Sequence, residues 1–389
     1  MLVLETIKVN EATSIKEIKE VLEDLLYVPD ERVKVKVIEE YCIYLDSKSK
    51  NSNYEIKSFI ARVNEIPVGI ATCYIHPSYT SYGRKCGVIG WLYVSNIDIC
   101  KELIARCESF FIKQGINKVR SGINFPKSLG GIGFQVKGFN EQMLYGVAFS
   151  SPEQNELKFL IELGYQVECN YTCLRVSSKT WDKGKKINGN IKFKYVPLKE
   201  IIAIHEQVQE LSNNSFQGIL PDTSGGRFEE FIYAFKQMPE NKSTLNHDIK
   251  LKELSNNPAF LNAWESCDLE YITPLMPMAF EKKTNELIGV LLGLPDLYEH
   301  WNGKKITRVN VDTAIVRKDY KGKGIFSALN NIGQLTCSLY GMTYFEGTTV
   351  WTGNSRGVNN TDAINSIMPH CIPIRKHVVL QKRLRRKLG

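Results

Sequence analysis

The pattern of apolar and polar residues along the chain predicts a strand, a turn and a helix close to the C-terminal end. The segment RVNVDTAIV (308–316) alternates and is rich in β-branched residues, as a half-buried strand is. A glycine-containing segment, DYKGKG (319–324), follows it. The next apolar residues fall on one helical face: Ile325, Leu329, Ile332 and Leu335.

The same order of elements occurs twice. NEIPVGIATCYIHPSY (64–79) parallels NELIGVLLGLPDLY (285–298), with Gly69 and Gly289 in the same place. Each segment predicts two strands joined by a tight Asn-Glu turn. A further strand follows in each copy (VIGWLYV and VDTAIV), then a helix that ends in glycine, and then another strand. The chain is therefore predicted to contain a long internal repeat.

A polar segment rich in Lys, Gly and Asn separates the two copies, at 177–193. A chain of 389 residues is too long for one ordinary core. We therefore expect two domains, 1–178 and 190–389. Each is predicted to be a mixed α/β unit, with a central, mixed but largely antiparallel sheet flanked by helices.

Composition narrows the class of protein. A hydrophobic content of 43% and a charged content of 24% are typical of soluble globular proteins, and no apolar run is long enough to cross a membrane. The N-terminus has no signal-peptide pattern, so a cytoplasmic location is expected. The ten cysteines are scattered without metal-ligand spacing, which predicts reduced, buried thiols and no metal site. The net charge of +8 comes partly from a basic C-terminal end, and we do not expect nucleic acid as a partner.

The turn KGKG at 321–324 predicts an anion site. Its glycines allow a ligand to approach the backbone closely, and the helix that follows directs free N–H groups and its positive dipole end toward the turn. Lys321 and Lys323 add positive charge. The turn is neither a Walker loop nor a dinucleotide fingerprint, because Ser327 stands where the third glycine of the fingerprint would be.

The longer segment IVRKDYKGKGIFSALN resembles the signature of the GCN5-related N-acetyltransferases, V-x-P-x-Y-R-G-K-G-I-G/A-x-x-L. The resemblance implies that backbone N–H groups of the loop bind the pyrophosphate of coenzyme A, and that the neighbouring strands hold its pantetheine arm. Lys318 replaces the proline, and Phe326 replaces a small residue, so the Phe326 side chain is expected to turn away from the phosphates. The residues assigned to the cofactor on this basis are Ile315, Val316, Lys321, Gly322, Lys323, Gly324, Ile325, Phe326, Ser327 and Asn354.

The N-terminal copy resembles the degenerate first copy of tandem acetyltransferase-like proteins. Its turn, YVSNIDICKEL, has no glycine. Ser95 and Asp98 fit a capping box, and Asp98 and Glu102 place negative charge where a pyrophosphate needs positive potential. We therefore expect acetyl-CoA to bind only in the C-terminal copy.

The resemblance implies direct attack of an amine on the thioester, assisted by a general base. Candidates for the base are Glu346, which we slightly prefer, and Asp312. The tyrosine that the family commonly uses as an acid has no counterpart after Asn354, and Tyr344 or His370 is considered in its place. Cys371 lacks a recognisable partner set for a nucleophile.

The sequence thus predicts an N-acetyltransferase that uses acetyl-CoA and a small-molecule or peptide amine. Two alternatives stay open. One is an aminoacyl-tRNA-dependent transferase of related fold, against which the intact KGKG turn argues. The other is a non-catalytic acyl-CoA-binding protein, which the missing tyrosine favours.

Overall fold

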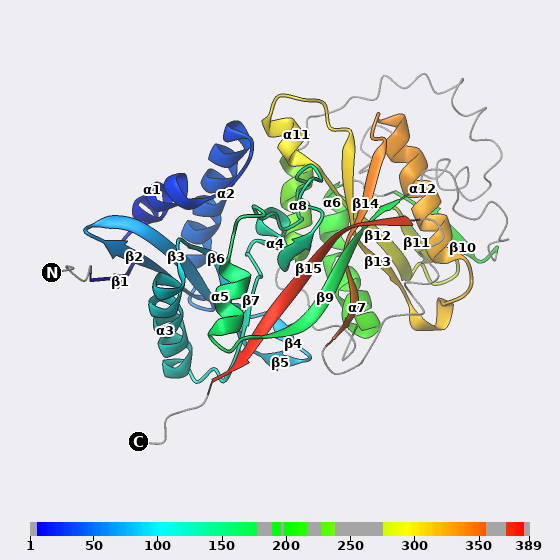
Figure 1. Cartoon of the computed structure of the whole chain (residues 1–389). Helices are drawn as coiled ribbons and strands as arrows, with labels where there is room; N and C mark the ends of the chain where they lie inside the picture. The colour runs from blue at the N-terminus through cyan, green and yellow to red at the C-terminus, as the bar shows by residue number, and fades with distance from the viewer. Residues whose placement is uncertain are drawn as a thin grey trace.

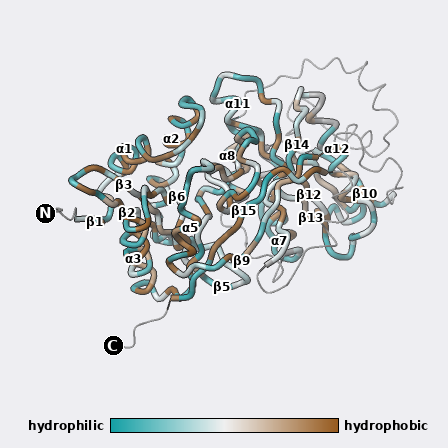
Figure 2. Tube along the Cα trace, in the orientation of Figure 1, coloured by the Kyte–Doolittle hydropathy of each residue, from teal (hydrophilic) through white to brown (hydrophobic). Residues whose placement is uncertain are grey.

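A computed structural model describes residues 6–176, 189–195, 198–216, 227–237, 275–354 and 371–384. Within these residues a thirteen-stranded mixed sheet runs through the molecule, with helices packed on both sides (Figure 1). This agrees with the predicted α/β class. Apolar residues concentrate along the strands and on the inward sides of the helices (Figure 2).

The first copy contributes the elements up to β9. They are β1 (Lys8–Glu11), α1 (Ile15–Leu25), α2 (Glu31–Ser49), β2 (Glu55–Val63), β3 (Ile66–Ile75), β4 (Thr80–Ser81), β5 (Arg84–Lys85), β6 (Gly87–Val94), α3 (Ile97–Lys113), β7 (Lys118–Ser121), α4 (Lys127–Gly130), β8 (Phe134–Lys137), α5 (Glu156–Glu162) and β9 (Gln166–Val176).

The second copy contributes the remaining described elements. They are β10 (Ile191–Lys194), α6 (Leu198–Ala203), α7 (His205–Phe216), α8 (Arg227–Gln237), β11 (Met278–Glu281), β12 (Leu287–Pro295), α11 (Leu297–Trp301), β13 (Arg308–Val316), the 3-10 helix η1 (Lys318–Tyr320), α12 (Ile325–Leu339), β14 (Tyr344–Asn354) and β15 (Cys371–Arg383).

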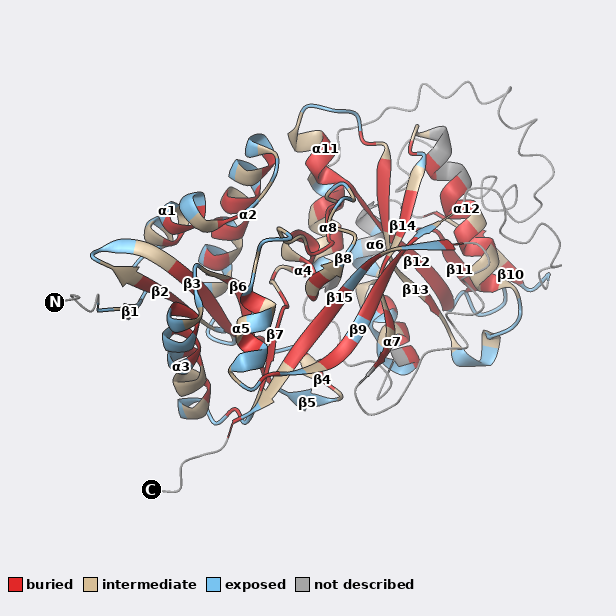
Figure 3. Ribbon diagram, viewed as in Figure 1, coloured by how far each residue is buried: buried red, intermediate tan, exposed pale blue. Residues whose placement is uncertain are grey.

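The two copies share one sheet because each gives its last strand to the other side. The strand order is β1-β2-β3-β6-β7-β15-β9-β14-β13-β12-β11-β10. Strand β15, from the end of the chain, pairs with β7 of the first copy, while β9 of the first copy pairs with β14 of the second. Strands β9 and β15 lie side by side at the centre and are buried over much of their length (Figures 1 and 3). The domain boundaries stay a prediction. With a boundary near residue 178, each predicted domain contains one strand that pairs with the other domain.

Alternate residues of the strands divide between two helical layers. In β3, Ile70 and Tyr74 belong to the hydrophobic cluster that contains α1 and α2, whereas Ala71 and Cys73 belong to the cluster of α3 and α5. In the second copy, Leu291 of β12 packs in the cluster of α12. The cluster of α1 and α2 also includes residues of α7 and α8, so these four helices share one core across the two copies.

The internal repeat predicted from the sequence extends to side-chain packing. A Cβ atom added at Gly69 would lie 2.8 Å from Ile99 and 2.9 Å from Leu103 of α3. A Cβ atom added at Gly289 would lie 3.1 Å from Ile325 and 3.2 Å from Leu329 of α12. In both copies the glycine therefore lets a helix pack directly on the hairpin strand.

The two hairpin turns differ from each other. Asn64 and Glu65 both have positive φ, 51° and 66°, and form the predicted two-residue turn between β2 and β3. In the second copy the predicted tight Asn-Glu turn is wrong. The N–H of Glu281 donates to the carbonyl of Glu286, so the loop between these two residues spans 282–285. It has four residues instead of two, so Asn285 and Glu286 do not form the turn by themselves.

Several other features concern the described residues alone. None of their helices is both long and apolar enough to span a membrane. No three His, Cys, Asp or Glu side chains among them come together as metal ligands. The nine cysteines in these segments are buried thiols.

Candidate active site

Strands β13 and β14 separate halfway along their length. They pair in parallel from Arg308 and Tyr344 to Val311 and Gly347. Beyond that point β13 continues to Val316 and β14 to Asn354, and no pairing joins these two ends within the described residues. We call the space between 312–316 and 348–354 the β13–β14 opening. On this side of β13, the backbone N–H and C=O groups beyond Val311 have no strand partner in β14.

A β-bulge marks the start of the opening. Leu292 of β12 pairs with Thr313 and Gly293 pairs with Val311, so Asp312 is an extra residue in β13. Bulges bend a strand and redirect its side chains. Asp312 is half-buried here, and one of its carboxylate oxygens accepts a hydrogen bond of 2.8 Å from the Thr313 hydroxyl. The bulge thus places a carboxylate at the point where the two strands part.

The glycine turn lies at the other end of the opening, between β13 and α12. Gly322 and Gly324 have φ of 75° and 81°, a region that favours glycine. A Cβ atom added at Gly322 would meet nothing within 4 Å, so the backbone there faces open space. The first N–H groups of α12 have no partner within the helix, and the exposed Lys321 and Lys323 flank them. These features fit the diphosphate of coenzyme A.

Side chains from the neighbouring hairpin hold this turn in place. The Tyr320 hydroxyl donates to Glu281 of β11 over 2.9 Å. Arg317 donates to Glu286 over 2.9 Å and to Asp319 over 2.8 Å, and the second bond lowers the pKa of the Asp319 carboxyl. The turn is thereby fixed against the β11–β12 hairpin before any ligand arrives.

The structure places the side chains of several other residues assigned to the cofactor in the packing of the fold. Ile315 and Ile325 are buried in hydrophobic clusters, so their side chains support the fold. Phe326 packs against the cluster of Leu174 and Cys371, which belong to β9 and β15. Asn354 ends β14 and pairs with Cys169, and its side chain lies outside the description.

Glu346 is fully buried in a different environment from Asp312. Both of its oxygens accept hydrogen bonds from Arg375 of β15, at 2.8 and 3.2 Å, and the Tyr344 hydroxyl adds a third at 2.8 Å. A fully buried carboxylate that already accepts three hydrogen bonds is poorly accessible to an incoming amine. The assignments of Glu346 and of Asp312 as the general base both stay predictions.

The candidates for the acid are placed as follows. Burial raises the pKa of the Tyr344 hydroxyl to about 12, and the hydroxyl is already bonded to Glu346. His370 lies outside the described residues. Burial also raises the pKa of the Cys371 thiol to about 11, which disfavours a thiolate nucleophile.

In the first copy, the chain's own residues fill the equivalent space between β6 and β7. These strands pair up to Ile89 and Ser121, and the side-chain oxygen of Asn124 then accepts a hydrogen bond of 2.7 Å from the Trp91 N–H. The Trp91 indole donates to the carbonyl of Phe125 over 2.7 Å. The segment 123–131 therefore occupies the position that is open in the second copy.

The start of α3 is also closed to an anion. The predicted capping box of Ser95 and Asp98 is wrong by one residue, because α3 begins at Ile97 and its cap is Asn96. The Asn96 side chain accepts a hydrogen bond from the Ile99 N–H over 3.0 Å. Nearby, the buried Glu156 accepts a hydrogen bond from the backbone N–H of Val94. Val94 pairs with Gly69 in the first copy, and Val316 pairs with Gly289 in the second, so the two valines occupy equivalent positions.

Sequence reasoning found the glycine turn but missed two features of the site. The bulge at Asp312 depends on the register between β12 and β13, which no residue pattern reveals. The hydrogen bond from the Trp91 backbone N–H to Asn124 depends on a single amide side chain in an irregular segment, and an asparagine there gives no distinctive sequence signal.

Comparisons with known proteins place this architecture. No protein-family model matches the chain, and no curated protein matches it. Among solved structures, a GCN5-related N-acetyltransferase from Sphaerobacter thermophilus superposes with a TM-score of 0.53 at 11% identity, covering 98% of this chain and 97% of that one. A tandem GNAT protein from the clavulanic acid biosynthesis pathway gives a TM-score of 0.51 at 10% identity over 97% and 98% of the two chains. The chain thus has the GCN5-related N-acetyltransferase fold in its tandem form.

A third solved structure shares the fold over part of its length. It is the GCN5-related glucosamine N-acetyltransferase region of a fungal multi-domain β-N-acetylglucosaminidase, with a TM-score of 0.52 at 12% identity. The match covers 98% of this chain and 38% of that one. The similarity therefore extends over nearly all of the present chain.

Proposed function

We propose that this protein is an acyl-CoA-dependent N-acyltransferase that transfers an acetyl group from acetyl-CoA to an amine. One observation carries the proposal. The second copy combines an opening between β13 and β14 with a glycine turn at a helix start, whereas the first copy closes both equivalent places with Asn124 and Asn96. The tandem acetyltransferase fold supports the same reaction class.

Acetyl-CoA would bind along this path. The free N–H groups at the start of α12, with Lys321 and Lys323, would hold the diphosphate. The unpaired edge of β13 beyond Val311 would bind the amide-containing arm as a strand binds an extended peptide. The N–H groups beside the bulge would then polarise the thioester carbonyl.

The transfer itself needs few groups from the protein. The amine nitrogen forms a bond to the acetyl carbon, the carbon–sulfur bond breaks, and the sulfur leaves as a thiolate. Asp312, directly or through a water molecule, would accept the proton that the ammonium group must lose. Once bonded to the acetyl carbon, the nitrogen must lose a second proton, and transfer of this proton to the thiolate, directly or through water, would give the amide and the free thiol. Holding both reactants at the opening would supply much of the rate enhancement.

The acceptor would be a small-molecule or peptide amine. A screen of amines with acetyl-CoA, in which release of free thiol is measured, tests the proposal. We expect thiol release that depends on the amine and is lost in Gly324→Val. Binding of acetyl-CoA without transfer to any amine would favour the acyl-CoA-binding alternative, and transfer from aminoacyl-tRNA would favour the tRNA-dependent one.

A further inference from the structure

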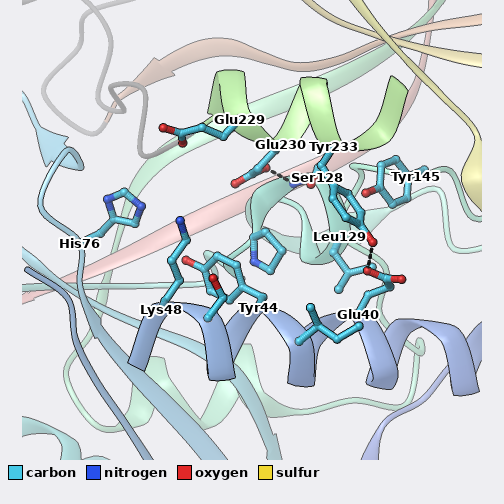
Figure 4. A pocket seen from close by; sticks show the side chains of 13 residues that line it. Glu40, Tyr44, Lys48, His76, Ser128, Leu129, Tyr145, Glu229, Glu230 and Tyr233 are labelled. Atoms are coloured by element: carbon cyan, nitrogen blue, oxygen red, sulfur yellow. Dashed lines mark hydrogen bonds between the residues drawn. The ribbon is translucent and has the colours of Figure 1, made fainter. Parts of the chain in front are cut away.

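A cavity of about 200 Å³ lies between elements of the two copies (Figure 4). Helix α2 of the first copy forms one wall and helix α8 of the second copy forms the other. None of the lining residues belongs to β13, β14, the glycine turn or α12. The lining residues are Glu40, Ile43, Tyr44, Ser47, Lys48, His76, Pro126, Ser128, Leu129, Tyr145, Glu229, Glu230 and Tyr233.

Hydrogen bonds hold the two walls in a fixed relation. The Tyr233 hydroxyl of α8 donates to Glu40 of α2. The Glu230 carboxylate accepts from the backbone N–H groups of Lys127 and Ser128, over 3.1 and 2.6 Å. The cavity is therefore preformed, as ligand sites usually are.

Tyr44 has a hydroxyl group that the protein leaves unsatisfied. It is buried at the cavity wall and has no hydrogen-bond partner in the described structure. A buried hydroxyl without a hydrogen-bond partner destabilises the folded protein. The tyrosine rises from α2 toward the residues of α8 (Figure 4), so a ligand in the cavity is placed to supply the missing partner.

The charges that line the cavity favour a cation. Three carboxylates, Glu40, Glu229 and Glu230, line the cavity together with the ammonium of Lys48, and the ammonium of Lys127 acts on His76 from close by. The Glu229 side chain is exposed at the edge of the cavity, and no hydrogen bond or ion pair is recorded for it within the described residues. His76 adds no positive charge, because burial lowers the pKa of its imidazole to about 3.

The remaining surface favours an apolar body. The rings of Tyr44, Tyr145 and Tyr233 line the cavity together with Ile43 and Leu129. Aromatic faces also attract cations at short range. Lys48 shows this effect within the protein, since its ammonium lies 5.0 Å from the centre of the Tyr54 ring.

We propose that this cavity binds a small organic cation, a primary ammonium group on an aromatic or apolar body, as a second ligand site distinct from the transfer site. The ammonium would be held by Glu229 and the Tyr44 hydroxyl, and the body would lie among the tyrosine rings. Because α2 and α8 come from different copies, the ligand would contact both halves of the protein.

Calorimetric titration of the full chain at neutral pH tests the proposal, with phenethylammonium as the probe. Its neutral analogue 2-phenylethanol and the anion 3-phenylpropanoate provide the comparison. We expect saturable binding of the cation, with affinity at least about tenfold above that of the alcohol, and no binding of the anion. Tyr44→Phe and Glu229→Gln should each weaken binding of the cation about tenfold, as expected for the loss of one hydrogen bond to a charged group.

Matched variants separate binding from folding. Tyr165→Phe removes another buried tyrosine hydroxyl, and Glu210→Gln removes an exposed carboxylate on α7. Neither residue lines the cavity, and both variants should bind the cation normally. Gly324→Val should also bind it normally, because the site is independent of acetyl-CoA binding. The proposal would be overturned if all three probes bound with equal affinity or if binding of the cation did not saturate. It would also be overturned if Tyr44→Phe bound the cation with unchanged affinity, or if Gly324→Val lost cation binding.

Discussion

Arg375 and Glu346 form a fully buried ion pair that reaches across an intervening strand. Glu346 lies on β14 and Arg375 on β15, with β9 between them. A second buried pair, Arg120 of β7 and Glu168 of β9, reaches across β15. Glu346 and Arg120 each occupy the penultimate paired position before their strands separate from β13 and β6. The two copies thus have similarly placed ion pairs with the charges interchanged, and both pairs fasten the exchanged strands.

Glu346→Gln should destabilise the protein strongly, because it leaves the buried guanidinium of Arg375 without a counter-charge. We expect the free energy of unfolding in urea to fall by about 3–5 kcal/mol. Replacing both residues by leucine should recover much of that loss. A Glu346→Gln protein with normal stability and no turnover would instead identify Glu346 as the general base.

Asp312→Asn should affect turnover and leave acetyl-CoA binding intact, because only the proton-transfer step loses its base. We expect the rate with a true acceptor to fall about a hundredfold, with partial recovery at high pH, where the amine loses its proton unaided. Steady-state rates from pH 6 to 9 and the calorimetric affinity for acetyl-CoA provide the measurement. Unchanged rates across this range would remove Asp312 from the mechanism.

Gly324→Val should weaken acetyl-CoA binding, because the side chain obstructs the backbone and strains a positive φ. We expect the dissociation constant to rise by at least about tenfold. Gly303→Val is the matched control, since Gly303 has φ of 72° in another turn and an added Cβ atom meets nothing within 4 Å. Both variants should lose about 1–2 kcal/mol of stability. Equal affinities in the two variants would mean that the turn has only a structural role.

Acetyl-CoA should bind once per chain. The Asn124 amide fills the space beside β6 and the Asn96 side chain caps α3, so both places in the first copy that correspond to the proposed site are occupied by the chain itself. Calorimetry should give one acetyl-CoA site per chain, and Gly324→Val should lower the affinity of all the acetyl-CoA binding that is measured. Two equivalent sites, or half of the signal retained at full affinity, would contradict this expectation.

Glu156→Gln should change how stability depends on pH. Burial raises the pKa of the Glu156 carboxyl in the folded protein to about 7, so folding favours its protonated form. The stability that this group contributes is present at low pH and is lost as pH rises from about 4.5 through 7. At pH 8 the glutamine variant should therefore be more stable than the wild type by about 2–3 kcal/mol, and at pH 5 nearly equal. Glu153→Gln, at an exposed position, should show no such trend.

The sequence by itself determined the repeated order of elements and the single glycine turn. Local periodicity predicts β13 and α12, because alternation and helical spacing depend on neighbouring residues only. The equivalence of Gly69 and Gly289 was also visible in the sequence, since each copy needs a small residue where a helix packs on the hairpin.

Only the tertiary structure decided the surroundings of each carboxylate and the order of the strands in the sheet. Asp312 and Glu346 look alike in sequence, but strand register turns one into a bulge and Arg375, brought from the chain's far end, buries the other. The exchange of β9 and β15 and the cavity between α2 and α8 likewise join residues distant in the chain. Such relations depend on long-range pairing, and a pattern of neighbouring residues does not specify it.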